Sequence, residues 1–225
     1  MRRLVILRPE PGASATAARA RAMGLDPVAM PLFTVEPVEW TVPDPAGYDA
    51  LLLTSANAVR HGGDGLARLR GLPLYAVGEA TAEAAREAGF DIAGTGDAGA
   101  ERLLGSIESD LRLLHLSGEH RMEPNATQAI TAIPVYRAAE LPLPDAFREI
   151  EGQVAAVHSP RAGQRLADMA GEAGIDRSTI RIAAISEAAS AAAGSGWERC
   201  EAADTPAEAA LLALAARLCD NRPET

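Results

Sequence analysis

Short apolar runs alternate with alanine-rich stretches along the whole chain. The runs cover residues 4–7, 27–38, 50–54, 72–77, 111–116, 133–138, 154–158 and 180–185. Most are apolar at every position and are followed by Ser, Gly or Pro and then by a stretch that favours a helix, such as residues 13–23. Strands of this kind are buried on both faces, as in a parallel sheet between two helical layers. The pattern therefore predicts an α/β fold built from βα units.

The chain also repeats itself after about 105 residues. Residues 51–60 resemble residues 155–164, residues 74–90 resemble residues 182–197, and residues 97–104 resemble residues 204–212. The segments 4–14 and 27–35 resemble the segments 113–122 and 133–138. The βαβ segment at 4–35 therefore comes before the other segments of the repeat, whereas its counterpart at 113–138 comes after the segments at 51–104.

That order predicts two similar, flavodoxin-like parallel-sheet domains, one of them discontinuous. We expect residues 1–31 and 141–225 to form domain 1 and residues 41–131 to form an inserted domain 2. Residues 32–40 and 132–140, rich in Pro, Val and aromatic side chains, would join them as a two-stranded extended connector. Two linkers at the same boundary would act as a hinge, and the two hinged domains would enclose a cleft between them.

Ligands of open parallel sheets bind beyond the carboxyl ends of the strands. Small, hydroxyl-bearing or cationic residues stand at the predicted ends, each just before a helix: Arg8, Thr54, Ser55, Gly78, Ser117, Gly118, Ser159, Arg161 and Ser186. Helix starts offer unpaired backbone N–H groups and the positive end of the helix dipole, which attract anions. Helix capping alone would also explain serine and threonine at such positions. Several such ends at one cleft favour a multiply anionic small molecule as ligand.

Composition narrows the range of partners. The chain of 225 residues is 48% hydrophobic with a formal net charge of −10, which argues against nucleic acid or an anionic membrane as partner. All 21 basic residues are arginine, which argues against a Schiff-base lysine or a Walker phosphate site. The sequence shows no transmembrane-length apolar run and no signal-peptide core, and Cys200 and Cys219 form no metal or disulfide pattern. We expect a cytoplasmic monomer.

Other motifs carry less weight. GTGDAG at 94–99 satisfies the dinucleotide-binding pattern, but the strand before it is short. His115, His120 and His158 lack the convergent further ligands that zinc requires, and no serine lies in a G-x-S-x-G elbow. Tyr136 lies in the returning connector beside the inferred hinge. It either packs the hinge or presents a phenol that donates a proton in the cleft.

Eight segments follow one another along nearly the whole chain: LRPEPGA (7–13), MPLFTVEP (30–37), LLLTSANAV (51–59), YAVGEATAEAAREAGF (75–90), LHLSGEHR (114–121), IPVYRA (133–138), VHSPRAG (157–163) and ISEAASAA (185–192). In their order and spacing, they resemble the uroporphyrinogen-III synthase family. The resemblance implies a two-domain enzyme that needs no metal or organic cofactor. Such enzymes close linear hydroxymethylbilane, invert its ring D and release water to give uroporphyrinogen III, a precursor of haem. Substrate and product are polycarboxylates, in agreement with the anion-attracting strand ends.

The resemblance also implies residue roles. The tyrosine of the family's connector motif falls on Tyr136, as general acid, and the threonine of its V-G-x-A-T motif falls on Thr81, beside Gly78. The chain departs from many members in the last repeat, where Ala188 and Ala189 stand in place of threonine. Ser186 or Ser190 would then be the nearby hydroxyl.

The net charge of −10 sets a condition on binding a polyanion. Local N–H groups with Arg8, Arg121 and Arg161 must outweigh the field of the whole chain, which screening beyond roughly 8–10 Å permits.

Two other functions stay open on these residues. A non-catalytic two-domain binding protein or sensor that closes around a polyanionic small molecule would show the same hinge, repeat and strand ends. A nucleotide-dependent oxidoreductase would rest on GTGDAG alone, and bound nucleotide would then be visible as absorbance after purification.

Overall fold

The chain forms two compact units, each built around its own sheet. The computed structural model describes residues 1–96, 99–121 and 123–220. Unit 1 comprises Met1–Thr34 and Glu140–Thr225, and unit 2 comprises Val35–Ala139. The boundaries fall inside two neighbouring strands, β3 (Phe33–Pro37) and β8 (Ala129–Glu140). Both sheets are mostly parallel, which confirms the predicted α/β class.

Unit 1 holds a five-stranded parallel sheet in the order β11-β10-β9-β1-β2. Its strands are β1 (Leu4–Ile6), β2 (Pro27–Ala29), β9 (Val154–Val157), β10 (Arg181–Ala184) and β11 (Arg199–Ala202). Numbered within the unit, this is the 2-1-3-4-5 order of flavodoxin-like sheets. The central strands β1 and β9 are buried at every position, so they read as continuous apolar runs.

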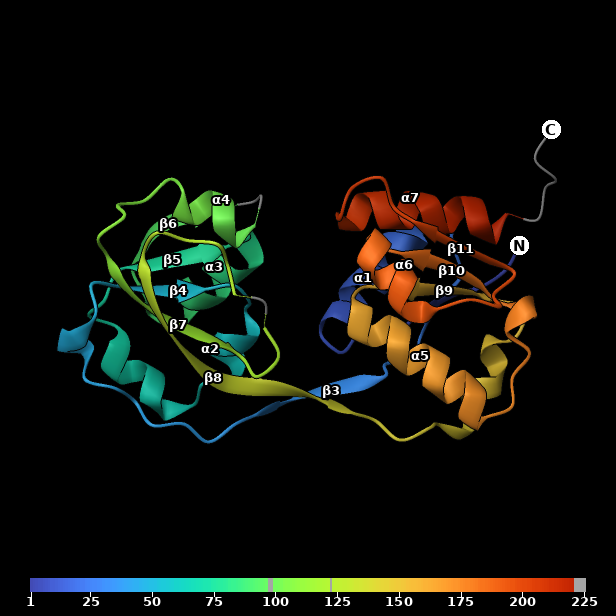
Figure 1. Ribbon diagram of the computed structural model, residues 1–225, viewed down its shortest axis with the longest axis horizontal. Coiled ribbons are helices and arrows are strands. Elements are labelled where there is room, and N and C mark those ends of the chain that lie inside the picture. Colours follow the sequence, from blue (N-terminus) through green and yellow to red (C-terminus); the bar gives the residue numbers. More distant parts are fainter. Residues whose placement is uncertain (97–98, 122, 221–225) are drawn as a thin grey trace. The chain divides into compact units, whose positions relative to one another are not determined.

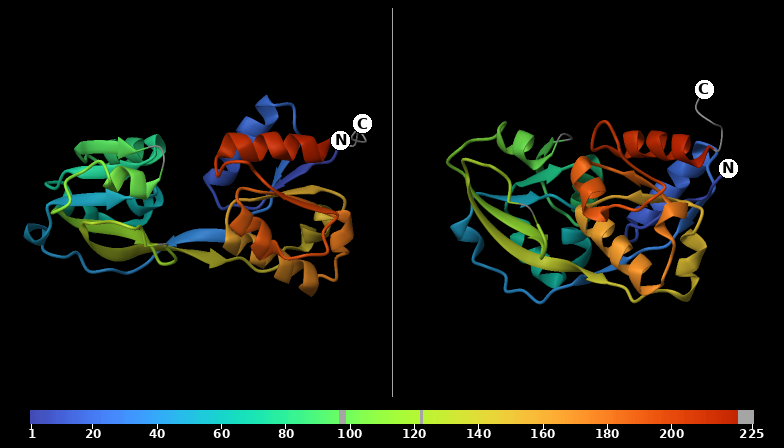
Figure 2. Two further views of the ribbon diagram at one scale, coloured as in Figure 1. Left: turned by 45° about the horizontal axis from the view of Figure 1, so that its top comes forward. Right: turned by 45° about the vertical axis from the view of Figure 1, so that its right-hand side comes forward.

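Helices cover both faces of this sheet (Figure 1). α1 (Gly12–Ala22) and α7 (Glu208–Cys219) share one apolar cluster with Leu4, Ile6 and Val154, and Figure 2 shows them on the same side of the sheet. α5 (Pro160–Glu172) and α6 (Glu187–Ala193) cover the other face and pack against each other. Gly163 permits their close approach, because a Cβ there would lie 2.6 Å from the carbonyl oxygen of Ala189.

Unit 2 holds a six-stranded sheet in the order β3-β8-β7-β4-β5-β6. The further strands are β4 (Ala50–Leu53), β5 (Leu74–Val77), β6 (Ile92–Gly96) and β7 (Arg112–Gly118), and all pairings from β4 to β8 are parallel. α2 (Asn57–His61) and α3 (Glu79–Glu87) cover one face, packing on Leu53 and Leu116. α4 (Ala100–Leu104) covers the other face, packing on Leu52 and Leu113. Short 3-10 helices lie at Pro45–Gly47, Asp64–Leu69, Asp145–Ile150 and Arg177–Thr179.

The two sheets share one strand order with different chain connectivity. Reading unit 2 from β7, the order β8-β7-β4-β5-β6 is again 2-1-3-4-5. Thus β7 and β8 correspond to β1 and β2 but follow the other three strands instead of leading them. The sequence repeat therefore reflects a permuted pair of similar folds.

Three details differ from the strands expected from the sequence. The run at 27–38 is divided by Met30–Leu32 into β2 and β3, which belong to different sheets. β6 and β11, at the outer sheet edges, were not among the predicted apolar runs, because both are partly exposed and carry glycine or charged residues. The structure places Gly94 and Gly96 within β6, with Asp97 and Ala98 of GTGDAG outside the described residues.

Packing explains those two glycines. A Cβ on Gly94 would lie 3.1 Å from Tyr75 Cδ1, and one on Gly96 would lie 2.9 Å from Leu103 Cβ. They admit neighbouring side chains within a strand, whereas the dinucleotide motif needs its glycines in the turn after one.

None of the helices within the described ranges has the length and apolar character of a membrane-spanning segment.

Candidate functional site

The residues singled out from the sequence divide between the two units. Unit 2 contains Thr54, Ser55, Gly78, Thr81, Ser117, Gly118 and Tyr136, and unit 1 contains Arg8, Ser159, Arg161 and Ser186. Within each unit, they gather at or just beyond the carboxyl ends of the parallel strands or in the first turn of the following helix. Tyr136 lies within β8.

Tyr136 is turned by an irregularity in strand pairing. Ser117 pairs with Pro134 but Gly118 pairs with Tyr136, so β8 contains one extra residue at this point. Consecutive strand residues normally point to opposite faces, yet Val135 and Tyr136 both pack on the apolar cluster beneath α2 and α3. The bulge therefore brings the phenol ring to the same face as α2.

The ring of Tyr136 is held from two sides. A Cβ on Gly118 would lie 2.9 Å from Cε2 and 3.1 Å from the hydroxyl oxygen, so the ring lies directly over this glycine. His61, at the end of α2, faces the ring with centroids 6.4 Å apart and planes inclined by 38°. Burial, assisted by the charge of Arg60, lowers the pKa of His61, which favours its neutral form beside the phenol.

A second set of polar residues lies at the strand ends on the opposite sheet face, which α4 covers. Thr54 Oγ1 lies 3.1 Å from Nε2 of His115, which is 2% exposed. Burial, with a contribution from the charge of Arg121, lowers the pKa of His115 to about 4. Ser117 is 1% exposed, and its Oγ has no hydrogen-bond partner among the described residues.

The turns before α2 and α3 present backbone groups. Ser55 Oγ accepts a hydrogen bond from the backbone N–H of Asn57 at 3.2 Å. Gly78 takes a positive φ of 83° to start α3, and no side chain caps that helix. Thr81 follows in the first turn and is buried. The start of α3 is therefore the more open of the two to an anion.

In unit 1, both serines act as helix caps. Ser159 accepts from the N–H of Ala162 at 3.2 Å, and Ser186 accepts from the N–H of Ala189 at 3.3 Å. Both serines therefore cap helices, as the capping explanation requires. It leaves each hydroxyl proton available for another acceptor.

Arg8 is held by the carboxylate of Glu208. Its Nη1 lies 3.2 Å from Oε2 of Glu208. The same oxygen contacts His158 Nε2 at 3.3 Å, and the other carboxylate oxygen, Oε1, accepts a hydrogen bond from Thr16. Burial acts to raise the pKa of Glu208, but the contacts with His158, Thr16 and Arg8 outweigh it and lower this pKa to about 2. A Cβ on Gly12 would lie 2.5 Å from Arg8 Nε, so the guanidinium also packs against α1.

The other two arginines expected to attract anions also face carboxylates. Arg161 in α5 lies 3.9 Å from Glu140 and stacks over the ring of Phe33 at 4.7 Å, and Arg121 lies 3.5 Å from Glu123. All three cations are therefore partly neutralised by the protein itself, which places more of the task of attracting anions on backbone N–H groups.

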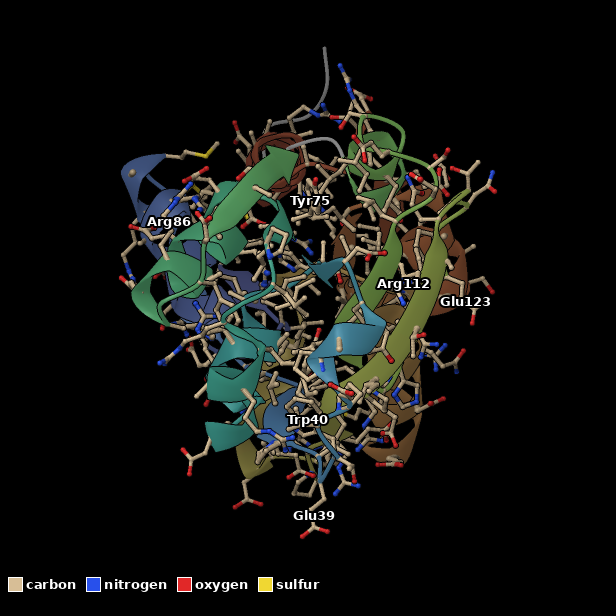
Figure 3. The ribbon with its side chains drawn as sticks, turned by 90° about the vertical axis from the view of Figure 1, so that its left-hand side faces the viewer. Glu39, Trp40, Tyr75, Arg86, Arg112 and Glu123 are labelled. Atoms are coloured by element: carbon tan, nitrogen blue, oxygen red, sulfur yellow. The ribbon has the colours of Figure 1, made fainter. Side chains whose placement is uncertain are left out.

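An open groove of about 680 Å³ lies beside His61 in unit 2. It is lined by residues 37–42 and 61–65. Trp40, labelled in Figure 3, fixes one wall by donating from Nε1 to the carbonyl oxygen of Gly62 at 2.9 Å, while the exposed Glu39 extends outward. His61 therefore lines this groove and also faces the ring of Tyr136.

Within residues 1–96, 99–121 and 123–220, no three His, Cys, Asp or Glu side chains are grouped as a metal site.

Sequence reasoning missed three residues of this site. His61 and Glu208 were not singled out, and His115 was interpreted as a strand-end histidine rather than a zinc ligand. A signal existed for His115, since a histidine in an otherwise apolar strand next to serine and glycine marks a buried polar end. None existed for the pairing of Glu208 with Arg8, 200 positions apart.

Comparisons with known proteins agree with this architecture. The family model described as uroporphyrinogen-III synthase HemD matches residues 14–213. A uroporphyrinogen-III synthetase from Helicobacter pylori superposes with a TM-score of 0.63 at 18% identity, covering 97% of this chain and 100% of that chain. A uroporphyrinogen III synthase from Thermus thermophilus gives a TM-score of 0.44 at 20% identity, covering 96% and 97%. No curated protein matches the sequence.

Proposed function

The chain belongs to the uroporphyrinogen-III synthase family, and on this premise we propose that it is a hydro-lyase closing linear hydroxymethylbilane to uroporphyrinogen III with inversion of ring D. As a member of that family it is an enzyme of haem biosynthesis acting on a small tetrapyrrole. The observation that carries the proposal is the family match across residues 14–213. That match is to an enzyme, so a non-catalytic polyanion sensor is not favoured.

In this proposal Tyr136 is the general acid. Its phenol gives a proton to the terminal hydroxyl of the substrate, which leaves as water. The azafulvene-like cation that remains bonds to the substituted α-carbon of ring D, and the original bond between that carbon and its methylene bridge breaks. The freed bridge carbon then bonds to the other α-carbon of ring D, which loses its proton, so that ring D is inverted and the macrocycle closes. The contacts of the ring with Gly118 and His61 support this role, because a proton donor is effective only when held in a productive orientation.

Substrate carboxylates would bind at the strand ends of each unit. In unit 2 we assign this to Thr54, Ser55, Gly78, Thr81, Ser117 and Gly118, and in unit 1 to Arg8, Ser159, Arg161 and Ser186. Preorganised N–H and O–H donors suit such a substrate, because charge-assisted hydrogen bonds are roughly twice as strong as neutral ones. The uncapped start of α3 and the free hydroxyl protons of the capping serines support this assignment.

Product analysis tests the function. Freshly prepared hydroxymethylbilane should give mainly isomer III at a rate proportional to protein concentration. Isomer I alone, at the rate without protein, would contradict the proposal and favour a binding protein.

A tyrosine pair tests the acid. Y136F should lower turnover by roughly tenfold or more, since one general acid is typically worth 10²–10⁴. Y75F removes the same hydroxyl from β5 in the same unit, on the face beneath α4, and should leave turnover unchanged. Equal turnover of both variants would exclude Tyr136 as the acid.

A further inference from the structure

Three polar side chains end the sheet face of unit 2 that α4 covers. Alternate residues of a strand share a face, so Leu113, which packs with α4, is followed on that face by His115 and Ser117. Thr54 follows β4, the neighbouring strand, and its Oγ1 lies 3.1 Å from His115 Nε2. The apolar face thus turns polar at the strand ends, where parallel sheets bind their ligands.

Two of these polar atoms have unmet hydrogen-bonding capacity. Within the part of the chain that the structure describes, neither His115 Nδ1 nor Ser117 Oγ has a partner, although both residues are almost completely buried. Such groups are costly in a folded protein and call for a functional explanation. Thr54, in contrast, is partly exposed and can reach a ligand.

The surroundings of His115 determine which nitrogen carries its proton. Burial favours the neutral imidazole, which has a single N–H. A proton on Nδ1 would leave a buried donor without an acceptor, which is rare in native structures. A proton on Nε2 is instead donated to Thr54 Oγ1, which leaves only an unused acceptor at Nδ1. The hydroxyl proton of Thr54 is then not used on His115.

We propose that His115 is a positioning residue that fixes the Thr54 hydroxyl as a hydrogen-bond donor to a carboxylate of the tetrapyrrole substrate. This role rests on the proposed function. Without the Nε2 donor, Thr54 could turn its own proton toward the imidazole and present only lone pairs to the anion. The pair therefore selects for an acceptor, as a carboxylate is, at this strand end.

Nuclear magnetic resonance of the unaltered protein tests the premise directly. Nitrogen-15 spectra of the histidine rings near neutral pH should show His115 as the Nε2–H tautomer, with its signals assigned by their loss in H115Q. An Nδ1–H tautomer or a charged imidazolium would overturn the proposal. The tautomer itself is read from the unaltered protein, and the variant serves only to assign the signals.

Kinetics with hydroxymethylbilane test the consequence. H115F keeps a planar ring but removes the donor, and T54V removes the hydroxyl. Each should raise KM about tenfold, the equivalent of one charge-assisted hydrogen bond, with kcat within twofold. The double variant should be no worse than either single one, because both remove the same contact. H115Q and T54S, which keep a donor at the corresponding position, should restore KM to within about threefold of the unaltered protein.

The outcomes separate this role from the function on which it rests. If the unaltered protein makes isomer III and folded H115F has an unchanged KM, the role of His115 is overturned while the function stands. Additive effects in the double variant would likewise overturn it. If the unaltered protein yields isomer I alone, the function itself fails and this role fails with it.

Discussion

The phenol ring of Tyr136 lies over the backbone of Gly118, with no room for even a methyl group between them. The two residues are register partners in adjacent parallel strands, joined at the point where β8 gains one residue. A glycine at this position is therefore part of how the tyrosine is aimed.

The first prediction follows from that contact. G118A should displace the ring, because its Cβ would lie 2.9 Å from Tyr136 Cε2, and turnover should fall by about tenfold or more, as expected when a general acid is misplaced. G71A, in a turn of the same unit with no atom within 4 Å of the new Cβ, is the matched control. Turnover and the ratio of isomers III and I would be measured for both. Full activity of G118A would show that the position of the ring does not matter.

A second prediction concerns acid stability. The pKa of Glu208 is lowered from 4.5 to about 2, so its ionised form stabilises unit 1 above pH 4.5, and this contribution is lost as the pH falls toward 2. The difference corresponds to roughly 3 kcal/mol in the free energy of unfolding. E208Q should be less stable at neutral pH and should lose less stability between pH 5 and pH 2.

Denaturant unfolding over this pH range measures the effect. E123Q, which removes an exposed carboxylate 3.5 Å from Arg121, should keep the steep pH dependence of the unaltered protein. Parallel curves for E208Q and the unaltered protein would contradict the prediction.

The third prediction uses two glycines of one helix. G163A places a methyl group 2.6 Å from the carbonyl oxygen of Ala189 and should lower stability by about 2 kcal/mol through overpacking of α5 against α6. The new Cβ of G171A meets nothing nearer than Arg177 Nη2 at 4.0 Å. This variant should therefore raise stability by about 0.5–1 kcal/mol, because alanine lowers the conformational entropy of the unfolded chain. Thermal unfolding of the two variants would show shifts of opposite sign, and shifts of the same sign would refute the packing argument.

A fourth prediction addresses the last repeat, where Ala188 and Ala189 stand in place of the threonine that the family resemblance leads us to expect. Ala188 is exposed in the first turn of α6, whereas Ala189 is completely buried. In denaturant unfolding, A188T should therefore have a midpoint close to that of the unaltered protein. A189T should lose about 1–3 kcal/mol in the free energy of unfolding. If a hydroxyl here assists turnover, A188T is the variant in which an increase would be measurable. Equal stability of the two variants would mean that α6 can shift away from its neighbour.

Much of the fold follows from residue pattern, because burial on both faces makes a strand apolar at every position. β1, β4 and β9 are of this kind, and they define the parallel sheets. Edge strands do not follow this pattern, because they are only partly buried. β11 begins with an arginine and is exposed or half-buried throughout, so no apolar run marks it.

The site was less accessible to sequence reasoning, because its decisive features depend on pairing between distant residues. Tyr136 and Gly118 could be named as candidates, but the bulge that stacks them is a property of strand register. The partners of Arg8 and Thr54 likewise come from α7 and β7, which no local pattern links to them.

The shared strand order has a consequence for how the chain arose and how it folds. In sequence, β1 to β6 and β7 to β11 are tandem copies of one module, yet neither copy closes a sheet of its own. Apart from β3, each copy gives its first two strands to one unit and its last three to the other, as in a domain swap carried out within a single molecule. Duplication of one module, followed by such an exchange, would produce this layout. During synthesis, β4 to β6 wait for β7 and β8, and β1 and β2 wait for β9 to β11, so unit 2 can be completed before unit 1.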